Sequence, residues 1–228
     1  MDCNHEQGRL ARVATRLEAR FAANLHSGSR RGPQTICRVG SLPLLISAPH
    51  AVNHPRDGNV KLADTYTGPF SLQVAKIIHA SVLVYARTSA EDPNYDPDGP
   101  YKRQLSELAN ATHAQLVVDI HGMALSRPAE MVIGTAGGKT LGKHGDILTV
   151  FESILRQHAI RDILIDDPYL FNASYEHTIT SYTWNRLKIP AMQIEIRKDL
   201  RNPDMNPCQY VQAVTAISEG LMAIAVLL

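Results

Sequence analysis

The chain has 228 residues, of which 44% are hydrophobic and 20% charged, a composition typical of a globular domain and not of a disordered or fibrous chain. Its 23 Lys and Arg residues against 22 Asp and Glu residues leave a formal net charge of +1, so no overall positive field favours nucleic acid as a partner. The longest apolar run, Leu221 to Leu228, is far below the roughly 20 residues of a membrane span, and no membrane association is expected.

The N-terminus and the cysteines predict the compartment. Asp2 and Glu6 lie near the N-terminus, where the apolar core of a signal peptide is missing. Cys3, Cys37 and Cys208 are scattered and form no C-x-x-C motif, which is typical of reduced thiols. We therefore expect a cytoplasmic protein.

Residues 1–34 are expected to form an N-terminal helix and a linker that pack on the rest of the chain. Apolar residues recur at helical spacing between Glu6 and Leu25, with arginines largely on the other side. A segment rich in Gly, Ser and Arg follows at 27–33 and ends this helix. Residues 35–228 are then expected to form a single metallohydrolase domain of the α/β class.

From Leu42 onward, short apolar runs alternate with amphipathic segments. Strands are predicted at Leu42–Ala48, Val82–Ala86, Gln115–Ile120, Met131–Gly134, Ile163–Ile165 and Ala191–Ile196. Helices are predicted at Phe70–Ala80, Tyr101–Thr112, Gly145–His158 and Pro207–Val226. This alternation predicts a three-layer α/β/α domain with a mixed, largely parallel sheet. Ligands of such sheets bind beyond the carboxyl ends of the strands.

Two histidines and a glutamate lie at the ends of three predicted strands. His50 follows the first strand, His121 follows the central one, and Glu195 lies in the last one. A carboxylate inside an apolar strand is rarely buried without a partner. Zn²⁺ binds imidazole and carboxylate ligands, and its catalytic sites keep one position open for water. The three residues therefore predict a metal site that hydrolyses an amide bond.

A catalytic base and a third metal ligand would complete this site. Glu195 suits the base that takes a proton from water and passes it to the leaving amine, and Arg197 lies two residues on, on the same strand face. We assign both to catalysis. The third ligand remains open among Asp57 in a turn, Asp119 on the central strand and Asp64 ahead of a helix, and we choose Asp64.

The chain resembles the N-formylglutamate amidohydrolase family, a branch of the zinc carboxypeptidase-like α/β hydrolases, over roughly Leu42 to Arg201. Five segments in order carry the resemblance: Ser47-Ala48-Pro49-His50, Ala63-Asp64-Thr65, Asp119-Ile120-His121-Gly122-Met123, Asp167-Pro168-Tyr169 with Thr178-Ile179-Thr180-Ser181-Tyr182, and Gln193-Ile194-Glu195-Ile196-Arg197. It implies the zinc carboxypeptidase-like fold and one zinc ion per chain. The implied ligands are His50, Asp64 and His121, and the implied general base is Glu195.

Two segments depart from the family's motifs. Asp92-Pro93-Asn94-Tyr95 stands where the family has Asp-Leu-Asn-Arg, and a tyrosine cannot bind a substrate carboxylate in the bidentate manner of arginine. Ser174-Tyr175-Glu176-His177 replaces the glycines of a Gly-Gly-Tyr-Ile-Thr stretch. Both changes affect the expected substrate and leave the metal ligands in place. The residues that we assign to substrate binding are Arg87, Arg103, Asn94, His177 and Thr180.

These residues predict a zinc-dependent amidohydrolase that cleaves an N-acyl amino acid, similar to N-formylglutamate, or a related small amide. The expected partner is a small molecule or short peptide that carries a carboxylate. One alternative is a metallopeptidase of carboxypeptidase or isopeptidase type, including one similar to the cell-wall amidases. The other is a binding protein on the same fold without catalytic activity.

Overall fold

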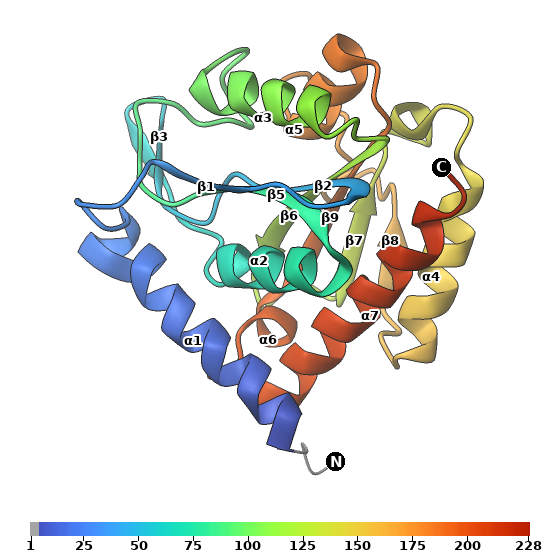
Figure 1. Ribbon diagram of the computed structural model, residues 1–228, viewed down its shortest axis with the longest axis horizontal. Coiled ribbons are helices and arrows are strands. Elements are labelled where there is room, and N and C mark those ends of the chain that lie inside the picture. The colour runs from blue at the N-terminus through green and yellow to red at the C-terminus, as the bar shows by residue number, and fades with distance from the viewer. Residues whose placement is uncertain (1–4) are drawn as a thin grey trace.

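Apolar runs of the chain pair into a seven-stranded sheet with helices on both faces (Figure 1). The computed structural model describes residues 5–228, and side chains from Gly8 onward. The strands are β1 (Thr35–Arg38), β2 (Leu42–Ala48), β3 (His54–Arg56), β4 (Asn59–Lys61), β5 (Ala80–Tyr85), β6 (Leu116–Met123), β7 (Met131–Gly134), β8 (Ile163–Ile165) and β9 (Ala191–Arg197). The helices are α1 (His5–His26), α2 (Thr67–Ile78), α3 (Pro100–Ala111), α4 (Asp146–Gln157), α5 (Ile179–Tyr182), α6 (Lys198–Arg201) and α7 (Pro207–Ala225), with short turns η1 (Lys139–Leu141) and η2 (Thr183–Leu187).

The large sheet has the order β1-β5-β2-β6-β9-β7-β8. Its four central strands, β5, β2, β6 and β9, run parallel to one another. Strand β1 is antiparallel to β5, and β7 is antiparallel to β9. Helices α3 and α5 cover one face of the sheet, and α2 and α7 cover the other (Figure 1). The predicted three-layer fold with a mixed, largely parallel sheet is therefore confirmed.

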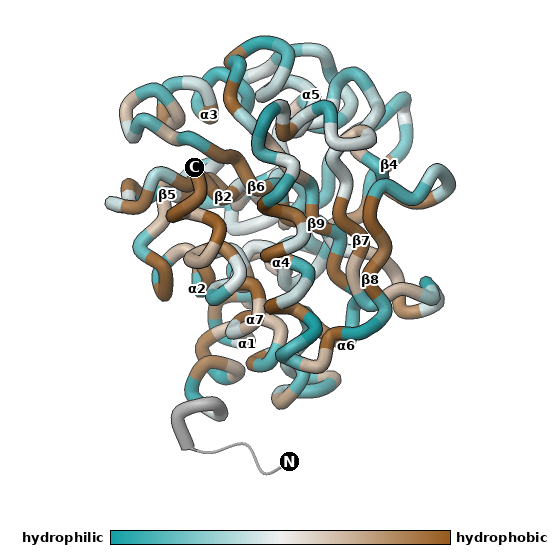
Figure 2. Tube along the Cα trace, turned by 90° about the vertical axis from the view of Figure 1, so that its right-hand side faces the viewer, coloured by the Kyte–Doolittle hydropathy of each residue, from teal (hydrophilic) through white to brown (hydrophobic). Residues whose placement is uncertain are grey.

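The central strands are covered on both faces, which explains why their sequences are mostly apolar. Every residue of β5 is buried, as is every residue of β2 from Leu44 to Ala48. Figure 2 shows the hydrophobic residues concentrated on these strands and on the helices that cover them. On the α2 side, Phe70 and Tyr210 meet edge to face with ring centres 5.8 Å apart. This packing holds the carboxyl ends of β2, β6 and β9 in fixed positions.

Helix α1 packs outside α2 and α7, with Ala14 and Phe21 fully buried (Figure 1). Its backbone leaves the helical conformation at Ala23, Asn24 and Leu25. The division of the chain into residues 1–34 and 35–228 stays a prediction.

The β3–β4 hairpin and the edge strand β1 were not expected from the sequence. Each hairpin strand has three residues, and Pro55 lies in the first of them, so no alternating pattern of useful length marks it. The pairing joins His54 to Lys61 and Arg56 to Asn59. The hairpin matters because it brings Arg56 and Lys61 to the cavity described below.

Two observations bear on the cysteines and on membranes. Cys37 is a free, exposed thiol, whereas Cys208 is disulfide-bonded, so the expectation of reduced thiols is wrong for Cys208. Cys3 lies outside the described residues. Among the helices of residues 5–228, none combines the length and the apolar character that crossing a bilayer requires. The compartment stays a prediction.

Candidate metal centre

The carboxyl ends of β2, β6 and β9 meet at one edge of the sheet, because these neighbouring strands are parallel. His50 follows β2 after a single proline, and His121 lies near the end of β6. Glu195 of β9 is paired in register with His121. The structure thus brings together the three residues that the strand ends had singled out.

Asp64 reaches the same place from the loop between β4 and α2. Its backbone N–H donates to the carbonyl of His50 at 2.8 Å, and the hydroxyl of Thr67 donates to the carbonyl of Asp64 at 2.7 Å. Tyr66 adopts a left-handed conformation with φ of 68°, which turns the chain directly into α2. These bonds fix the carboxylate of Asp64 against the two histidines.

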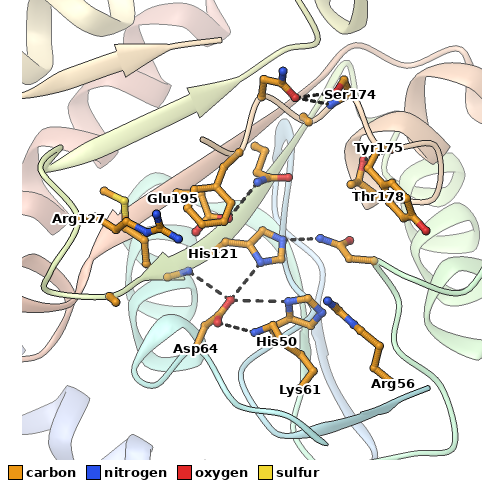
Figure 3. Close-up of a pocket in the computed structure, with 18 residues that line it drawn as sticks. His50, Arg56, Lys61, Asp64, His121, Arg127, Ser174, Tyr175, Thr178 and Glu195 are labelled. Carbon is orange, nitrogen blue, oxygen red and sulfur yellow. Dashed lines mark hydrogen bonds and ion pairs between the residues drawn. The ribbon is translucent and has the colours of Figure 1, made fainter. Parts of the chain in front are cut away.

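His50, Asp64 and His121 are buried, and each offers one ligand atom within 4.8 Å of the others. Asp64 Oδ2 lies 3.2 Å from His121 Nδ1 and 3.7 Å from His50 Nδ1 (Figure 3). His50 Nδ1 is buried and forms no hydrogen bond among the described residues. Two imidazole nitrogens and a carboxylate oxygen therefore converge, and their partners within the group are one another and the N–H of Gly122. This donor set fits a divalent metal ion.

The far nitrogen of each histidine is held by a second, fully buried carboxylate. His50 Nε2 lies 2.7 Å from Asp92 Oδ1, and His121 Nε2 lies 2.9 Å from Asp119 Oδ2. Such carboxylate–histidine pairs fix the tautomer that leaves the other ring nitrogen free, and they raise its basicity as a metal ligand. This arrangement is a further reason why the residues fit a metal.

Of the three aspartates considered as the third ligand, the structure places Asp64 in the cluster. Asp57 is exposed in the hairpin turn and accepts a hydrogen bond from the hydroxyl of Tyr95. Asp119 holds the opposite nitrogen of His121. The assignment of His50, Asp64 and His121 as ligands remains a prediction about function that this geometry favours.

Gly122 allows the backbone of β6 to pass close to a buried arginine. A Cβ atom at this position would lie 2.2 Å from Arg201 Nε, so no larger residue fits without displacing the arginine. The N–H of Gly122 donates to Asp64 Oδ2 at 3.3 Å, and Arg201 Nη1 donates to the carbonyl of Met123 at 3.3 Å. The arginine thus supports the strand end that carries His121.

The pKa values of Asp64 and Glu195 are shifted in opposite directions, that of Asp64 by neighbouring charges and hydrogen bonds and that of Glu195 by burial. Burial alone would raise the pKa of Asp64, but Lys61, with its Nζ 2.7 Å from Oδ1, and the two histidines hold it well below its usual range. Burial raises the pKa of Glu195 to about 7, although the charge of His121 opposes this shift. A carboxyl group with a pKa near neutrality can both accept and return a proton, as a general base requires.

Asn94 presents its amide to the same cavity. Its Oδ1 accepts the N–H of Ile179 at 2.8 Å, and this bond turns Nδ2 toward His121 Nε2, also at 2.8 Å. A ring nitrogen that donates its proton to Asp119 cannot accept one from Asn94. The amide of Asn94 therefore lies directly beside the cluster, at the cavity wall.

Asn94 is the predicted substrate-binding residue that lines the cavity; the other four lie elsewhere. Arg87 donates to the carbonyl of Arg30, and Arg103 is exposed and faces Asp98 at 3.5 Å. The carbonyl of His177 accepts a hydrogen bond from Lys102 outside the cavity. Thr180 is fully buried in α5.

The predicted catalytic Arg197 also lies outside the cavity. Its guanidinium forms two hydrogen bonds with Asp199, at 2.8 and 3.0 Å, and approaches Glu130 at 3.8 Å. Residues at i and i+2 of a strand share a face, but Arg197 ends β9 and its side chain turns to α6. Its geometry therefore does not favour the catalytic role that we assigned.

Sequence reasoning missed most of the cavity wall. The cavity above the cluster has a volume of about 480 Å³ and receives three cationic residues, Arg56, Lys61 and Arg127, from the hairpin and from the β6–β7 loop. Tyr175 and Thr178 contribute from the segment before α5. On the floor, Gln193 donates to Glu195 Oε1 at 3.0 Å. The one indication in the sequence that cationic residues line this cavity was the position of Arg56 and Lys61 shortly before Asp64.

No protein-family model and no curated protein sequence matches the chain. Among solved structures, N-formylglutamate amidohydrolase from Ralstonia eutropha JMP134 is similar with a TM-score of 0.61 and 17% identity, over 85% of this chain and 97% of that one. A bacteriophage poly-gamma-glutamate hydrolase is similar with a TM-score of 0.57 and 13% identity, over 85% and 90%. These matches show that the chain shares its fold with hydrolases of amide bonds, including the family that its motifs resemble.

Proposed function

We propose that this protein is a zinc-dependent amidohydrolase that cleaves the amide bond of a small N-acyl amino acid or a related amide. The observation that carries the proposal is the convergence of His50 Nδ1, His121 Nδ1 and Asp64 Oδ2, with both distal ring nitrogens held by buried aspartates. The shared fold with amidohydrolases and the buried Glu195 beside the cluster support the same activity.

The residues of the chain have distinct tasks in this reaction. A bound zinc ion would supply a Lewis acid that polarises the amide carbonyl and acidifies water. Glu195 takes a proton from the attacking water as the C–O bond forms, and it returns that proton to the nitrogen as the C–N bond breaks. Asn94, whose amide lies at the cavity wall beside His121, orients the substrate. The cations of the wall, Arg56, Lys61 and Arg127, favour a substrate with a carboxylate.

The first experiment measures metal content by mass spectrometry on protein purified without added metal. We expect about one zinc ion per chain, bound to His50, Asp64 and His121. The His121→Ala variant should lose the metal. A variant that retains a full equivalent of zinc would contradict the ligand assignment.

The second experiment tests catalysis with a series of N-acyl amino acids. Glu195→Gln should keep its zinc and lose activity by roughly a hundredfold to ten-thousandfold, because the proton acceptor is removed while the ligands are unchanged. Glu152→Gln is the matched control, since Glu152 lies on α4 and pairs with Arg156. Release of free amino acids from peptides, with no cleavage of simple N-acyl amino acids, would favour the metallopeptidase alternative. Near-normal activity of Glu195→Gln would contradict the assignment of the base.

A further inference from the structure

Two arginines reach the cavity from different segments of the chain. Arg56 lies on β3 of the hairpin, and Arg127 lies in the loop between β6 and β7. Figure 3 places them on opposite sides of the group formed by His50, Asp64 and His121. A substrate whose amide bond lies over this group therefore has one guanidinium on each side.

Each arginine is held against an aromatic ring. The Cζ atom of Arg56 lies 5.3 Å from the ring centre of Tyr95, and that of Arg127 lies 5.5 Å from the ring centre of Phe171. A cation over an aromatic face is attracted by the ring without using its N–H donors. Both side chains therefore have a ring contact that favours their position at the cavity before a substrate arrives.

The donors that remain free suit carboxylate ligands. Arg56 uses Nε and Nη2 on Asp92 Oδ2, at 2.8 and 2.6 Å, and its Nη1 has no hydrogen-bond partner in the described part of the chain. The guanidinium of Arg127 forms neither a hydrogen bond nor an ion pair with any residue of that part. Arg127 can therefore bind a planar anion through parallel N–H donors, whereas Arg56 offers its charge and the N–H groups of Nη1.

The charge of the cavity wall also favours a ligand with carboxylate groups. Its charged side chains are three cations, Arg56, Lys61 and Arg127, and two carboxylates, Asp64 and Glu195. Arg56 is paired with the fully buried Asp92 and Lys61 with Asp64, so Arg127 is the cation of this lining without an ion pair in the described part of the chain. A divalent metal ion would add two positive charges. Two negative charges on the substrate would be well accommodated by this surplus.

We propose that the substrate carries a carboxylate on each side of the scissile amide, and that Arg56 and Arg127 bind one carboxylate each. The substrate class is an amino acid acylated by a dicarboxylic acid, in place of an N-formyl or other uncharged acyl group. This inference rests on the proposed function, because it places the amide bond over the metal cluster. It assigns roles to two residues that the sequence did not single out.

The test compares three matched compounds. N-succinyl-L-alanine has both carboxylates, N-butanoyl-L-alanine lacks the one on the acyl side, and N-succinylethylamine lacks the one on the amine side. We expect the first to have the highest kcat/KM, and loss of either carboxylate to lower it by roughly tenfold to hundredfold. Equal kcat/KM values for N-butanoyl-L-alanine and N-succinyl-L-alanine would overturn the proposal.

The two arginines are distinguished by a crossed pattern. One of Arg56→Gln and Arg127→Gln should impair both succinyl compounds and spare N-butanoyl-L-alanine, whereas the other should impair both alanine compounds and spare N-succinylethylamine. If both variants act on the same carboxylate, the two-sided arrangement is wrong. Arg38→Gln is the control, because Arg38 is an exposed arginine paired with Val82 at the opposite end of the sheet.

Arg56→Gln leaves the buried Asp92 without its arginine, so Arg56→Lys is measured beside it. The lysine keeps a cation next to Asp92 but loses the planar fork, and we expect it to retain zinc and still bind the affected carboxylate at least several-fold more weakly. Zinc content and unfolding temperature are recorded for every variant. An Arg56→Lys variant that binds all three compounds normally would remove Arg56 from the proposal.

Binding is also measured without turnover, by calorimetry on the zinc-loaded Glu195→Gln variant with the same three compounds. The inference is supported if N-succinyl-L-alanine binds most tightly and if Arg56→Gln and Arg127→Gln, each added to this variant, give the crossed pattern. This result would support the inference even if the wild-type protein hydrolysed none of the three compounds. In that case only the proposed function would fail. Hydrolysis of all three compounds with equal affinities overturns the inference and leaves the proposed function standing.

Discussion

The floor and the rim of the cavity are built in different ways. The floor consists of His50, Asp64, His121 and Glu195, of which each is at most 8% exposed and three stand at the ends of parallel strands. The rim consists of Arg56, Tyr95, Arg127, Phe171 and Tyr175, all from the hairpin or from loops, and Tyr175 is 52% exposed. The floor is therefore held by the sheet itself, whereas the rim depends on connecting segments.

This difference separates two properties of the proposed enzyme. The sheet fixes the groups that we propose to hold a metal and to move a proton, and such groups need a geometry defined to within a fraction of an ångström. The loops fix the groups that select the substrate, and loops can change without disturbing the sheet. Tyr95, which stands where the resembled family has arginine, is one such change. Substitutions on the floor should therefore alter metal binding or catalysis, and substitutions on the rim should alter the choice of substrate.

Among substitutions that leave the three proposed ligands in place, the largest effect on zinc binding is expected from the carboxylates behind the floor histidines. Asp119→Asn keeps the shape of the side chain but removes the charge 2.9 Å from His121 Nε2, so the imidazole becomes a weaker ligand. We expect zinc affinity to fall by roughly tenfold to hundredfold. The affinity is measured by competition with a chromogenic chelator.

Asp199→Asn is the matched control for this substitution. Asp199 pairs with Arg197 outside the cavity, so its loss should leave zinc affinity unchanged. Wild-type affinity in Asp119→Asn would mean that the buried carboxylate does not act through His121, and the distinction between floor and rim would lose its physical basis.

The sequence predicted the floor better than the rim for a physical reason. The strands at Leu42–Ala48, Met131–Gly134 and Ile163–Ile165 have the predicted bounds, because apolar runs between turn residues mark buried strands clearly. Parallel strands bring their carboxyl ends together whatever the loops do, and this geometry predicted that His50 and His121 would meet.

No comparable rule predicts where the side chains of loops lie. The third ligand stayed open among three aspartates, since the path from β4 to α2 depends on the left-handed conformation of Tyr66 and on contacts formed only in the fold. Arg87 and Arg103 were chosen as substrate cations, but Arg56 and Arg127 line the cavity. Nothing in the local sequence of an arginine distinguishes a rim position from any other exposed position.

A second prediction concerns the layer beneath the floor. Glu18 of α1 is 5% exposed, and burial raises its pKa to about 7, from the usual 4.5 or so, although the charge of Arg201 opposes this shift. The unfolded chain loses this proton near pH 4.5 and the folded protein only near pH 7. The contribution of the protonated Glu18 to the free energy of unfolding is therefore fully present below pH 4.5. It decreases between pH 4.5 and 7 and is lost above pH 7.

Glu18→Gln should remove this decrease in the free energy of unfolding, because glutamine does not ionise. We expect the variant to be more stable than the wild type by about 2–3 kcal/mol above pH 7, and the difference to vanish toward pH 4.5. Urea unfolding at several pH values measures it. Parallel stability curves for the two proteins would show that Glu18 is solvated when ionised. Zinc affinity should not change, since the substitution leaves the floor intact.

The smallest effect is expected at Lys61, the residue of the β3–β4 hairpin whose side chain contacts the floor. Its Nζ lies 2.7 Å from Asp64 Oδ1, so its charge both stabilises the carboxylate and repels a metal ion on the other side of it. Lys61→Met removes this repulsion. Because the lysine side chain is 24% exposed and partly screened, we expect zinc affinity to rise by only about threefold to tenfold. Lys61→Arg keeps the charge and should leave the affinity unchanged. If both variants instead weaken zinc binding, Lys61 acts by holding the carboxylate in position, and the hairpin then belongs to the structural support of the floor.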